Sequence, residues 1–431
     1  MTNNDLFQQI ISGNYISPDS GEKLTEFFPK ALVAKVKVDI LPLLAEIGHE
    51  DLAQSLIICD NNSYRLLGQF LHDRLKCKII ILDNLIKPDL EHINKIVEKI
   101  KIDGQKLVIA IGSGTISDIA KYSSFMAGIS YIIIPTAPSM NGYASRAASI
   151  IAKGFRTSKL AHIPKLIILD KEILATAPLR LIQSGVGDSL CRATAQVDWF
   201  FSHLIIGTPY LEAPFAMLYN YEQELLQNLV KLKNRDEDSL ILLMKILLIS
   251  GFGMSISGGS YPASGGEHML AHTIEMVYGG KLEHKFHGEQ IAVTSLIMAK
   301  IQNEQEQKSW YKSLYETNRG ALIVPEREIL EFFGEKIGKE CLAAYKIKQD
   351  LLKLKRNSSE NFRSEFVILE KQIKEQISKK NISAEKLKEY LEIMGCPTDF
   401  KDLGLSESQA NLVVKYAKYS RDRLTFLDLL A

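Results

Sequence analysis

The sequence predicts an α/β domain at the amino-terminal end, built around a doubly wound parallel sheet, followed by an all-α domain. Three features carry this prediction. Short apolar runs rich in β-branched residues recur through the first part of the chain, helical patterns separate these runs, and strand-like runs become rare after Pro178. Such runs are typical of strands buried on both faces, and their alternation with helices favours a doubly wound sheet.

Each expected strand is brief and is bounded by Asp, Gly or Pro. The five runs cover residues 56–59, 78–82, 107–111, 131–134 and 166–169. Amphipathic helical patterns separate them, for example over 66–75 and 90–100. We place this Rossmann-like domain at residues 1–180.

The remaining residues, 181–431, are expected to form the helical domain. Helical periodicity runs through 181–194, 211–233, 238–256 and 267–278. Residues 346–380 are rich in Lys, Glu and Gln and carry Leu and Ile at spacings near three and four, which predicts a charged, solvated helical insertion.

The composition limits the classes of partner and compartment. The chain has 431 residues, enough for two domains with separate cores, and its net charge is +1. Without an excess of positive charge, we expect neither nucleic acid nor an anionic membrane as a main partner. Five scattered cysteines favour reduced thiols, and the first residues lack a signal-peptide pattern. The apolar stretch 240–256 is too short and interrupted to span a bilayer, so we expect a cytoplasmic protein.

A glycine-rich turn follows the third expected strand. Residues 112–118 read GSGTISD, and we expect a helix over 119–126. Glycines at such a turn let backbone N–H groups approach a phosphate, and the helix amino end adds partial positive charge. Ser117 stands where the third glycine of the dinucleotide fingerprint would be, so glycines kept for steric reasons alone are an equal interpretation.

A second polar loop, residues 135–145, follows the next expected strand. Loops at the carboxyl ends of parallel strands are where α/β sheets bind ligands. The two loops would flank one crevice if their strands are neighbours. The alternative is an ordinary loop shaped by its two prolines, Pro135 and Pro138.

A possible metal site follows in the helical part. Asp188 lies in a glycine-rich segment that we take as a helix entry, His268 and His272 are four residues apart on one helix face, and His287 follows a short link. One oxygen and two nitrogen ligands with an open fourth position are typical of a catalytic zinc-type site. The residues alone do not decide between His268 and His272 as ligand. His284 is interpreted as a solvated loop residue, and the order H-E-x-x-H of metalloproteases is absent.

Five motifs in order resemble one known superfamily. They are IAIGSGTISDIAKY, PTAPSMNGYAS, SGVGDSLCR, SGGEHMLAH and HKFHGEQIAV, between Ile109 and Val293. With them the chain resembles the iron-containing alcohol dehydrogenase and dehydroquinate synthase-like superfamily, and within it the sn-glycerol-1-phosphate dehydrogenases, particularly the bacterial type. Residues beyond Asn303 carry no signature of the family.

The resemblance implies a dinucleotide-binding domain, a metal-binding domain and an active site between them. It implies metal ligation by Asp188, His268 and His287, with Asp188 also touching the substrate. His272 matches an imidazole that contacts substrate or handles protons. The family also suggests homodimers or larger homo-oligomers. The NAD(P) contacts that the resemblance implies are Gly114, Thr115, Ile116, Ser117, Asp118, Thr136, Ala137, Pro138, Ser139 and Ser145.

One position departs from the family pattern. The family places an aspartate that contacts substrate before the glycine of the second loop, and this chain has Asn141 there. Asparagine keeps an acceptor but loses the negative charge and gains donors. We therefore expect Asn141 to bind a substrate that differs from the family's, or the substrate proton to leave by another route, such as His272.

The expected function is a metal-dependent, NAD(P)-linked interconversion of dihydroxyacetone phosphate and sn-glycerol 1-phosphate, or of a related polyol phosphate. A substrate phosphate could dock near the glycine run 257–266 at a helix start, and a turn-rich hinge is an equally good interpretation of that run. Three alternatives stay open: a dehydroquinate synthase-like lyase with tightly bound NAD, a dehydrogenase of unphosphorylated polyols, and a non-catalytic dinucleotide sensor. Asp60 and Asp83 both end strands, so the choice between NAD and NADP stays open too. Zinc is the expected metal, with nickel or iron as alternatives.

Overall fold

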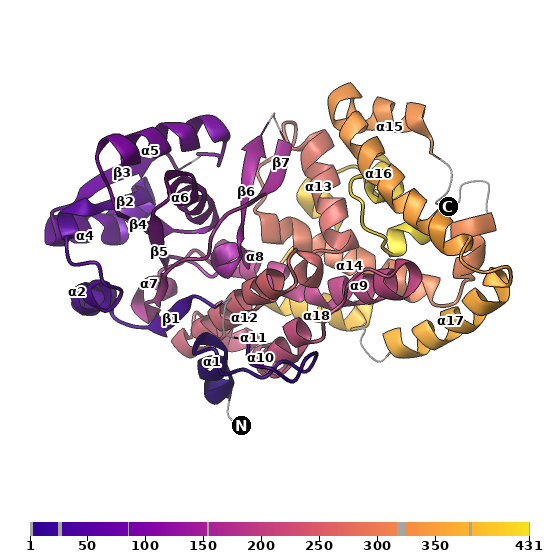
Figure 1. Cartoon of the computed structure of the whole chain (residues 1–431), viewed down its shortest axis with the longest axis horizontal. Coiled ribbons are helices and arrows are strands. Elements are labelled where there is room, and N and C mark those ends of the chain that lie inside the picture. Colours follow the sequence, from indigo (N-terminus) through magenta and orange to yellow (C-terminus); the bar gives the residue numbers. More distant parts are fainter. Residues whose placement is uncertain are drawn as a thin grey trace. The chain divides into compact units, whose positions relative to one another are not determined.

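The computed structural model of the chain describes residues 3–24, 28–84, 86–152, 155–316, 324–378 and 382–430. It contains two compact units (Figure 1). The first consists of Met1–Gly185 and Glu212–Gly258, and the second of Val186–Leu211 and Gly259–Ala431. The chain therefore passes between the units three times, whereas the sequence analysis places a single boundary at residue 180.

The first unit contains a six-stranded parallel sheet in the order β1-β8-β5-β4-β2-β3. The five strands expected from the sequence are all present. β1 is additional, because its residues KALV begin with a lysine and include only one β-branched residue, so they do not form a continuous apolar run. The strands are β1 (Lys30–Val33), β2 (Ser55–Asp60), β3 (Lys78–Leu82), β4 (Leu107–Gly112), β5 (Ser130–Pro135) and β8 (Leu166–Leu169).

Burial explains why these runs are almost continuously apolar. All of β4 and nearly all of β2 and β5 are buried, whereas the edge strand β3 is partly exposed. One face of the sheet packs against α2 (Val36–Glu46) and α4 (Gln69–Leu75). Helices α5 (Leu90–Ile102) and α6 (Gly114–Ala127) pack on each other, and α6 contacts β4 and β5 (Figure 1). The predicted doubly wound α/β class is confirmed.

Helices also extend the first unit. The long helix α12 (Glu237–Ile256) packs against α10 (Ala213–Gln227) and α7 (Lys171–Ala175). Length and composition alone would let α12 cross a membrane, but 78% of its apolar window is buried inside the protein. It is therefore the core helix of this unit, which explains its lack of a polar face. The other elements of the first unit are α1 (Asn3–Ile11), η1 (Leu52–Gln54), α3 (Asn61–Ser63), η2 (Tyr64–Gly68), η3 (Gly142–Ala144), the antiparallel hairpin β6 (Ala147–Ala152) and β7 (Phe155–Leu160), and α11 (Leu229–Lys233).

The second unit is helical throughout the residues that the structure describes. Its core gathers apolar side chains from many helices around Phe201, Trp310 and Phe426, whose rings stack edge-on or tilted. The elements are α9 (Arg192–Ile206), η4 (Tyr261–Ala263), α13 (Gly266–Tyr278), α14 (His287–Gln305), η5 (Lys312–Glu316), α15 (Glu326–Phe333), α16 (Glu335–Arg356), α17 (Phe362–Ile377), α18 (Ala384–Met394), η6 (Phe400–Leu403), α19 (Glu407–Tyr416), η7 (Ala417–Tyr419) and η8 (Phe426–Leu429). Helix α8 (Leu179–Leu190) runs across the division between the units.

The charged segment 346–380 forms the second half of α16 and all of α17, and its last two residues lie outside the described part. It is not only a solvated pair, because Lys348, Leu352, Phe366 and Ile373 are fully or almost fully buried. Its spacing of Leu and Ile marks a face that packs into the core of the second unit.

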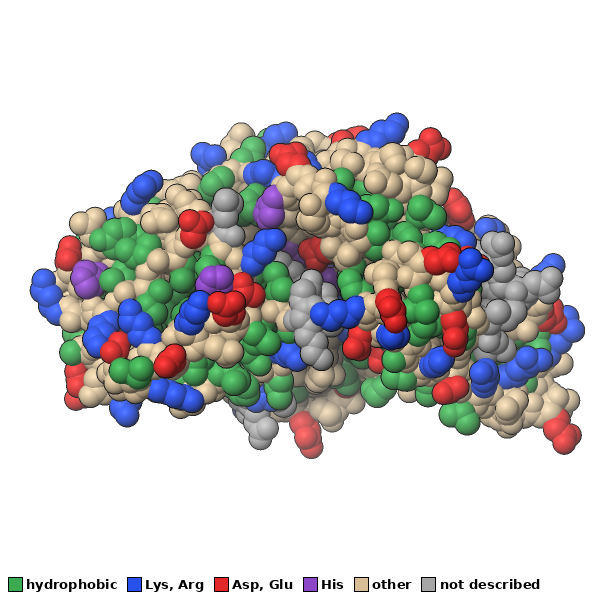
Figure 2. All heavy atoms as spheres, turned by 90° about the horizontal axis from the view of Figure 1, so that it is seen from above, with side chains coloured by type: hydrophobic (Ala, Val, Ile, Leu, Met, Phe, Trp, Pro, Cys, Tyr) green, Lys and Arg blue, Asp and Glu red, His purple; other side chains and the backbone are tan. Residues whose placement is uncertain are grey.

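The mixture of surface charges and the state of the cysteines agree with what the composition predicts, namely a balanced charge and reduced thiols. Figure 2 shows positive and negative side chains intermixed over the face that it draws. All five cysteines are buried, and none of them forms a disulfide. Burial raises the pKa of the Cys77 thiol to about 11, which keeps it protonated at neutral pH.

Candidate active site

The two loops singled out in the first unit lie side by side. Their strands β4 and β5 are neighbours, Gly112 pairs with Pro135, and the Thr136 N–H donates to the Gly112 carbonyl at 3.1 Å. A side-chain carbon added to Gly114 would come within 3.2 Å of the Met140 side chain. The strand order also reverses between β2 and β4, and ligands of doubly wound sheets bind beside such a switch point.

Helix α6 begins earlier than expected. It starts at Gly114, so residues 114–118 form its first turn rather than a loop before a helix at 119. Ile116 turns inward and packs over Gly112, where an added side-chain carbon would come within 2.7 Å of it. The first helical hydrogen bond runs from the Ser117 N–H to the Ser113 carbonyl, at 3.0 Å. The preceding N–H groups of the turn therefore lack partners within the helix, which suits an anion.

Most of the predicted cofactor residues are buried. Gly114, Thr115 and Thr136 are partly exposed, and the other seven expose less than a tenth of their surface. Ser145 shows what a buried member does: its hydroxyl donates to the carbonyls of Gly142 and Ala147 at 3.1 and 2.9 Å. The seven buried residues shape the carboxyl edge of the sheet from inside, whereas the three partly exposed residues present atoms at its surface.

Two residues that the sequence analysis did not single out hold the second loop. Tyr143 donates from its hydroxyl to the Ala137 carbonyl at 2.7 Å. Lys121, fully buried on α6, donates to the Gly142 carbonyl at 2.6 Å and to the Ala147 carbonyl at 3.1 Å. Helical spacing could have revealed Lys121, since it lies four residues after the buried Ser117 on the inner face of α6.

Glycines in α8 allow two close approaches. The sequence analysis placed Asp188 at a glycine-rich helix entry, but Gly185, Gly187 and Asp188 all lie inside α8. A side-chain carbon on Gly185 would lie 1.8 Å from the Pro138 carbonyl oxygen, in the first unit. On Gly187 it would lie 2.1 Å from the Gly288 carbonyl oxygen, in the second. The glycines are therefore needed for packing within the helix rather than for a turn before it.

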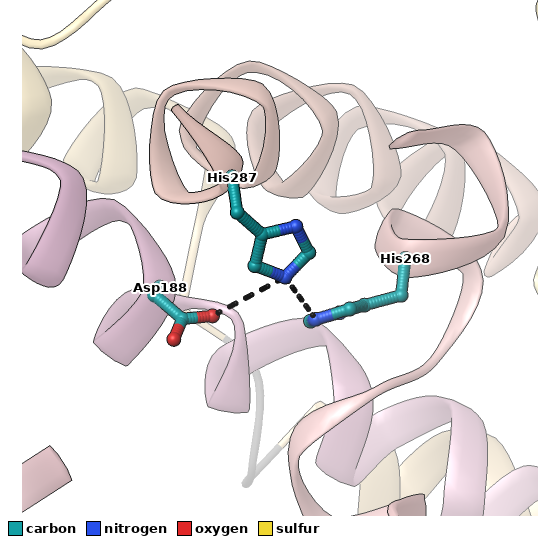
Figure 3. Close-up of side chains that lie close together, drawn as sticks. All are labelled: Asp188, His268 and His287. Atoms are coloured by element: carbon teal, nitrogen blue, oxygen red, sulfur yellow. Dashed lines mark hydrogen bonds and ion pairs between the residues drawn. The ribbon is translucent and has the colours of Figure 1, made fainter. Parts of the chain in front are cut away.

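Asp188, His268 and His287 point toward one another from α8, α13 and α14 (Figure 3). His287 Nε2 lies 3.3 Å from His268 Nε2 and 4.0 Å from Asp188 Oδ1. One ligand atom from each residue lies within 4.8 Å of the others. Two imidazole nitrogens bound to one tetrahedral zinc ion would lie about 3.3 Å apart, given Zn–N bonds of about 2.0 Å. Asp188 and His268 are buried, whereas the His287 side chain is 33% exposed, so the site is accessible from one side.

Glu267 orients the first of these histidines. Its carboxylate accepts a hydrogen bond from His268 Nδ1 at 2.9 Å, from the Gly265 N–H at 2.5 Å and from the Thr194 hydroxyl at 2.9 Å. Burial opposes ionisation, but the hydrogen bond and charge of His268 lower the pKa of Glu267 overall. A carboxylate on Nδ1 leaves Nε2 for a metal. Glu267 also meets Cys191 and His268 in a second group of ligand-type atoms, but its oxygens already hold these three donors.

His272 lies beside the three converging side chains and not among them. Its ring centroid is 6.0 Å from that of His268 and 6.1 Å from that of His287. Burial, followed by the positive charge of Arg421, lowers the pKa of His272 to about 4, although Glu275 at 3.5 Å opposes this. The ring is therefore neutral at pH 7. His284 is exposed.

Asn141 belongs to the first unit. It is 9% exposed and lies within the second loop, directly before η3. A side-chain carbon on Gly251 of α12 would lie 2.6 Å from the Asn141 carbonyl oxygen, so the helix backbone and the loop are in close contact. The position of Asn141 is thus fixed by packing against α12.

Comparison with known proteins identifies the family. The model of the iron-containing alcohol dehydrogenase family matches residues 36–178. A glycerol-1-phosphate dehydrogenase [NAD(P)+] of Thermococcus kodakarensis is 34% identical over 248 residues, which is 57% of this chain and 70% of that protein. The chain belongs to the glycerol-1-phosphate dehydrogenase family. A Bacillus subtilis member is 27% identical over 337 residues, or 74% of this chain and 86% of the relative.

Solved structures show the same fold at low sequence identity. A probable glycerol dehydrogenase from Sinorhizobium meliloti has a TM-score of 0.58 at 17% identity, covering 93% of this chain and 91% of that one. A sulfoacetaldehyde reductase from Bifidobacterium kashiwanohense, solved with NAD+, has a TM-score of 0.57 at 14% identity, covering 93% and 95%. These structures share the fold, whereas the relatives named above confirm the predicted family and its enzymatic class, an NAD(P)-linked alcohol dehydrogenase.

Proposed function

We propose that this chain reduces dihydroxyacetone phosphate reversibly to sn-glycerol 1-phosphate with NADH or NADPH, and that Asp188, His268 and His287 hold the divalent metal on which the reaction depends. The observation that carries the proposal is the convergence of these three side chains, far apart in the sequence, in a member of the glycerol-1-phosphate dehydrogenase family.

The three residues suit a divalent ion in number, kind and spacing. They supply one oxygen and two nitrogens and leave room for a further ligand, and Glu267 fixes the tautomer of His268. A bound cation would polarise the substrate carbonyl, and a reduced nicotinamide would supply the hydride. Zinc, iron(II) or nickel would each accept this donor set.

The chain's own groups would position the reactants and manage the proton. The carboxylate of Asp188 is 1% exposed, so its charge acts at close range with little screening by water. His272 is neutral at pH 7, so it can donate a proton from one ring nitrogen while the other accepts one. This fits the relay role that the resemblance implies for His272.

The cofactor would bind at the carboxyl edge of the sheet in the first unit. The N–H groups of the first turn of α6 would receive the pyrophosphate, and Thr136 would contact the cofactor beside it. Asn141 is proposed to bind the substrate through its side-chain amide, which can both donate and accept. A cytoplasmic location and a homodimeric or larger assembly stay predictions.

The first experiment follows NADH and NADPH oxidation with dihydroxyacetone phosphate, dihydroxyacetone and a small panel of ketose phosphates, after loading with zinc, nickel or iron(II). We expect the highest kcat/KM with dihydroxyacetone phosphate, and sn-glycerol 1-phosphate rather than its enantiomer as product. Phosphate release from a heptulosonate-type substrate, with NAD retained, would instead establish a lyase.

The second experiment tests the metal ligands. His268→Ala should lose both the bound metal and turnover, with activity falling by at least about a thousandfold. The matched control is His284→Ala, which removes an exposed histidine close by in sequence and should keep both. A metal-loaded, active His268→Ala enzyme would refute the ligand assignment.

A further inference from the structure

Two arginines of the carboxyl-terminal segment lie beside the amino end of α13. Arg421 and Arg423 follow η7, and both are partly buried. Lys348 holds this segment, because its amino group donates to the carbonyls of Lys418 and Arg423 at 2.7 and 3.2 Å. The two guanidinium groups therefore project from a segment whose backbone is held in place by hydrogen bonds.

Arg423 is fully engaged by its neighbours. It donates to the Ser264 carbonyl and, at 2.8 Å, to the Ser260 hydroxyl. Its guanidinium also lies 4.1 Å from the centroid of the Tyr261 ring. These three contacts explain Arg423 as a positioning residue that locks the segment against residues 260–264.

Arg421 has far fewer contacts. Its one hydrogen bond among the described residues is a long one, 3.4 Å to the Ser264 hydroxyl. Within the described part of the chain it forms no ion pair within 4.0 Å. Burial, together with the positive charge of Arg423, lowers the pKa of Arg421 to about 10, so it stays charged at pH 7. A guanidinium with several unused donors beside a second cation is costly unless an anion approaches it.

Three acidic groups act on Arg421. Asp422 is exposed and forms no ion pair with Arg421 within 4.0 Å, and the other two are already occupied. Glu267 holds three donors, as described above, and Glu275 faces His272 at 3.5 Å and Gln290 at 3.4 Å. The glycine run before α13 is occupied as well, because the Gly265 N–H donates to Glu267 and the Gly266 N–H to Asp198 at 2.7 Å. An anion at this end of α13 would therefore find Arg421 rather than those two backbone N–H groups.

Arg421 is close to the proposed metal ligands. It contacts Ser264, four residues before His268, and its charge acts on His272. The ring centroid of His272 in turn lies 6.0 Å from that of His268 and 6.1 Å from that of His287. Arg421, His272 and the proposed metal ligands therefore belong to one neighbourhood of the second unit.

We propose that Arg421 binds the phosphate group of the substrate, with Arg423 fixing the segment that presents it. The inference rests on the proposed function in one respect only, that the substrate is a phosphomonoester. A guanidinium can donate two parallel hydrogen bonds to a phosphate, which fixes both its position and its orientation. Arg421 is then the residue that makes a phosphorylated ketose a better substrate than the free ketose.

The kinetic test compares Arg421→Met and Arg421→Lys with the wild-type metal-loaded enzyme. The ratio of kcat/KM for dihydroxyacetone phosphate to that for dihydroxyacetone should fall by about 10- to 100-fold in Arg421→Met, mainly through KM. Arg421→Lys keeps the positive charge but loses the planar pair of N–H donors, so the ratio should fall less than in Arg421→Met. Arg327→Met, which removes an arginine that is 91% exposed, should leave the ratio unchanged. An unchanged ratio in Arg421→Met would overturn the inference.

A binding test separates this inference from the proposed function. Inorganic phosphate is titrated calorimetrically into the metal-loaded wild type and into the same variants. We expect wild type and Arg327→Met to bind alike, and Arg421→Met to bind at least about tenfold more weakly. If wild type binds phosphate through Arg421 but does not turn over dihydroxyacetone phosphate, the proposed function fails and the inference stands. If Arg421→Met binds as tightly as wild type, or wild type does not bind, the inference fails.

Discussion

Among the residues that the structure describes, each unit buries one lysine completely, and the two lysines do similar work in different electrostatic settings. Lys121 of the first unit donates to the carbonyls of Gly142 and Ala147, in the loop proposed to contact the cofactor. Lys348 of the second unit donates to two carbonyls of the segment that carries Arg421. In each unit a buried amino group thus fixes a stretch of irregular backbone that would otherwise need water for its carbonyls.

The difference between them lies in the counter-charge. Lys348 lies 2.6 Å from Asp428, which is 1% exposed, whereas Lys121 forms no ion pair within 4.0 Å among the described residues. Burial lowers the pKa of both lysines, and that of Lys121 falls to about 8, with Asp118 opposing the fall. A neutral amine still has two N–H donors, so Lys121 can hold its two carbonyls without its charge. Lys348 is tied to Asp428 and has no such freedom.

The largest effect is expected from removing Lys348. Lys348→Met leaves the Asp428 carboxylate buried without its partner, which should lower the free energy of unfolding by about 3–5 kcal/mol. Urea unfolding followed by circular dichroism measures this. The double variant Lys348→Met/Asp428→Leu removes both charges and should recover much of the loss. If the double variant is no more stable than the single one, the ion pair does not explain the difference between the two lysines.

The second prediction concerns pH and Lys121. The folded protein releases the Lys121 proton near pH 8, whereas the unfolded chain keeps it until about 10.5. Between these values the unfolded state binds more protons, so the contribution of this group to stability rises with pH. The full difference corresponds to about 3 kcal/mol. We expect the stability of wild type to rise relative to Lys121→Met between pH 8 and 10, in paired urea titrations. A constant difference over that range would mean that Lys121 keeps its proton.

The third prediction concerns cofactor affinity. Lys121→Met removes two hydrogen bonds that hold the second loop, so NADH should bind about five- to tenfold more weakly, as measured by fluorescence titration. The metal content should not change, because the ligands belong to the other unit. Lys121→Arg restores charge and donors, but its larger head must fit a fully buried site, so partial recovery is expected. Equal loss of metal and of NADH would indicate general unfolding instead.

The sequence predicted the sheet well because its signal is local. Each buried strand is a short apolar run whose neighbours in the chain mark its ends, and all five expected runs are strands. β1 and the hairpin of β6 and β7 were not expected. KALV begins with a lysine and includes only one β-branched residue, and FRTSKL carries polar side chains on a pair of strands outside the main sheet. The expected start of α6 was too late because Gly114 is unfavourable in helices. In the structure Gly114 is nevertheless helical, and an added side-chain carbon there would lie 3.2 Å from the Met140 side chain.

The candidate site also has residues that the sequence points to and residues that only the structure reveals. The residue types suggest a metal but do not decide between His268 and His272. The family resemblance implies His268, and in the structure it is His268 that converges with Asp188 and His287. Glu267 and Arg421 could not be recognised from the sequence, because acidic and basic residues are usually exposed and nothing local marks Glu267 as buried or Arg421 as partly buried. For Lys121 the only signal is its helical spacing from Ser117. Their roles depend on contacts with residues far away in the chain, such as Ala147 for Lys121 and Ser264 for Arg421.

The smallest effect is expected from a lysine that has a partner but is not buried. Lys95 and Glu91 form an ion pair of 2.8 Å one turn apart on α5, with side chains 66% and 78% exposed. Water and salt screen such a pair, and holding two long side chains costs entropy, so its net contribution is small. Lys95→Met should leave the urea midpoint unchanged within error, and raising the salt concentration should not separate the variant from wild type. If Lys95→Met destabilised the protein as much as Lys348→Met, the presence of a carboxylate, and not burial, would determine what a lysine contributes in this chain.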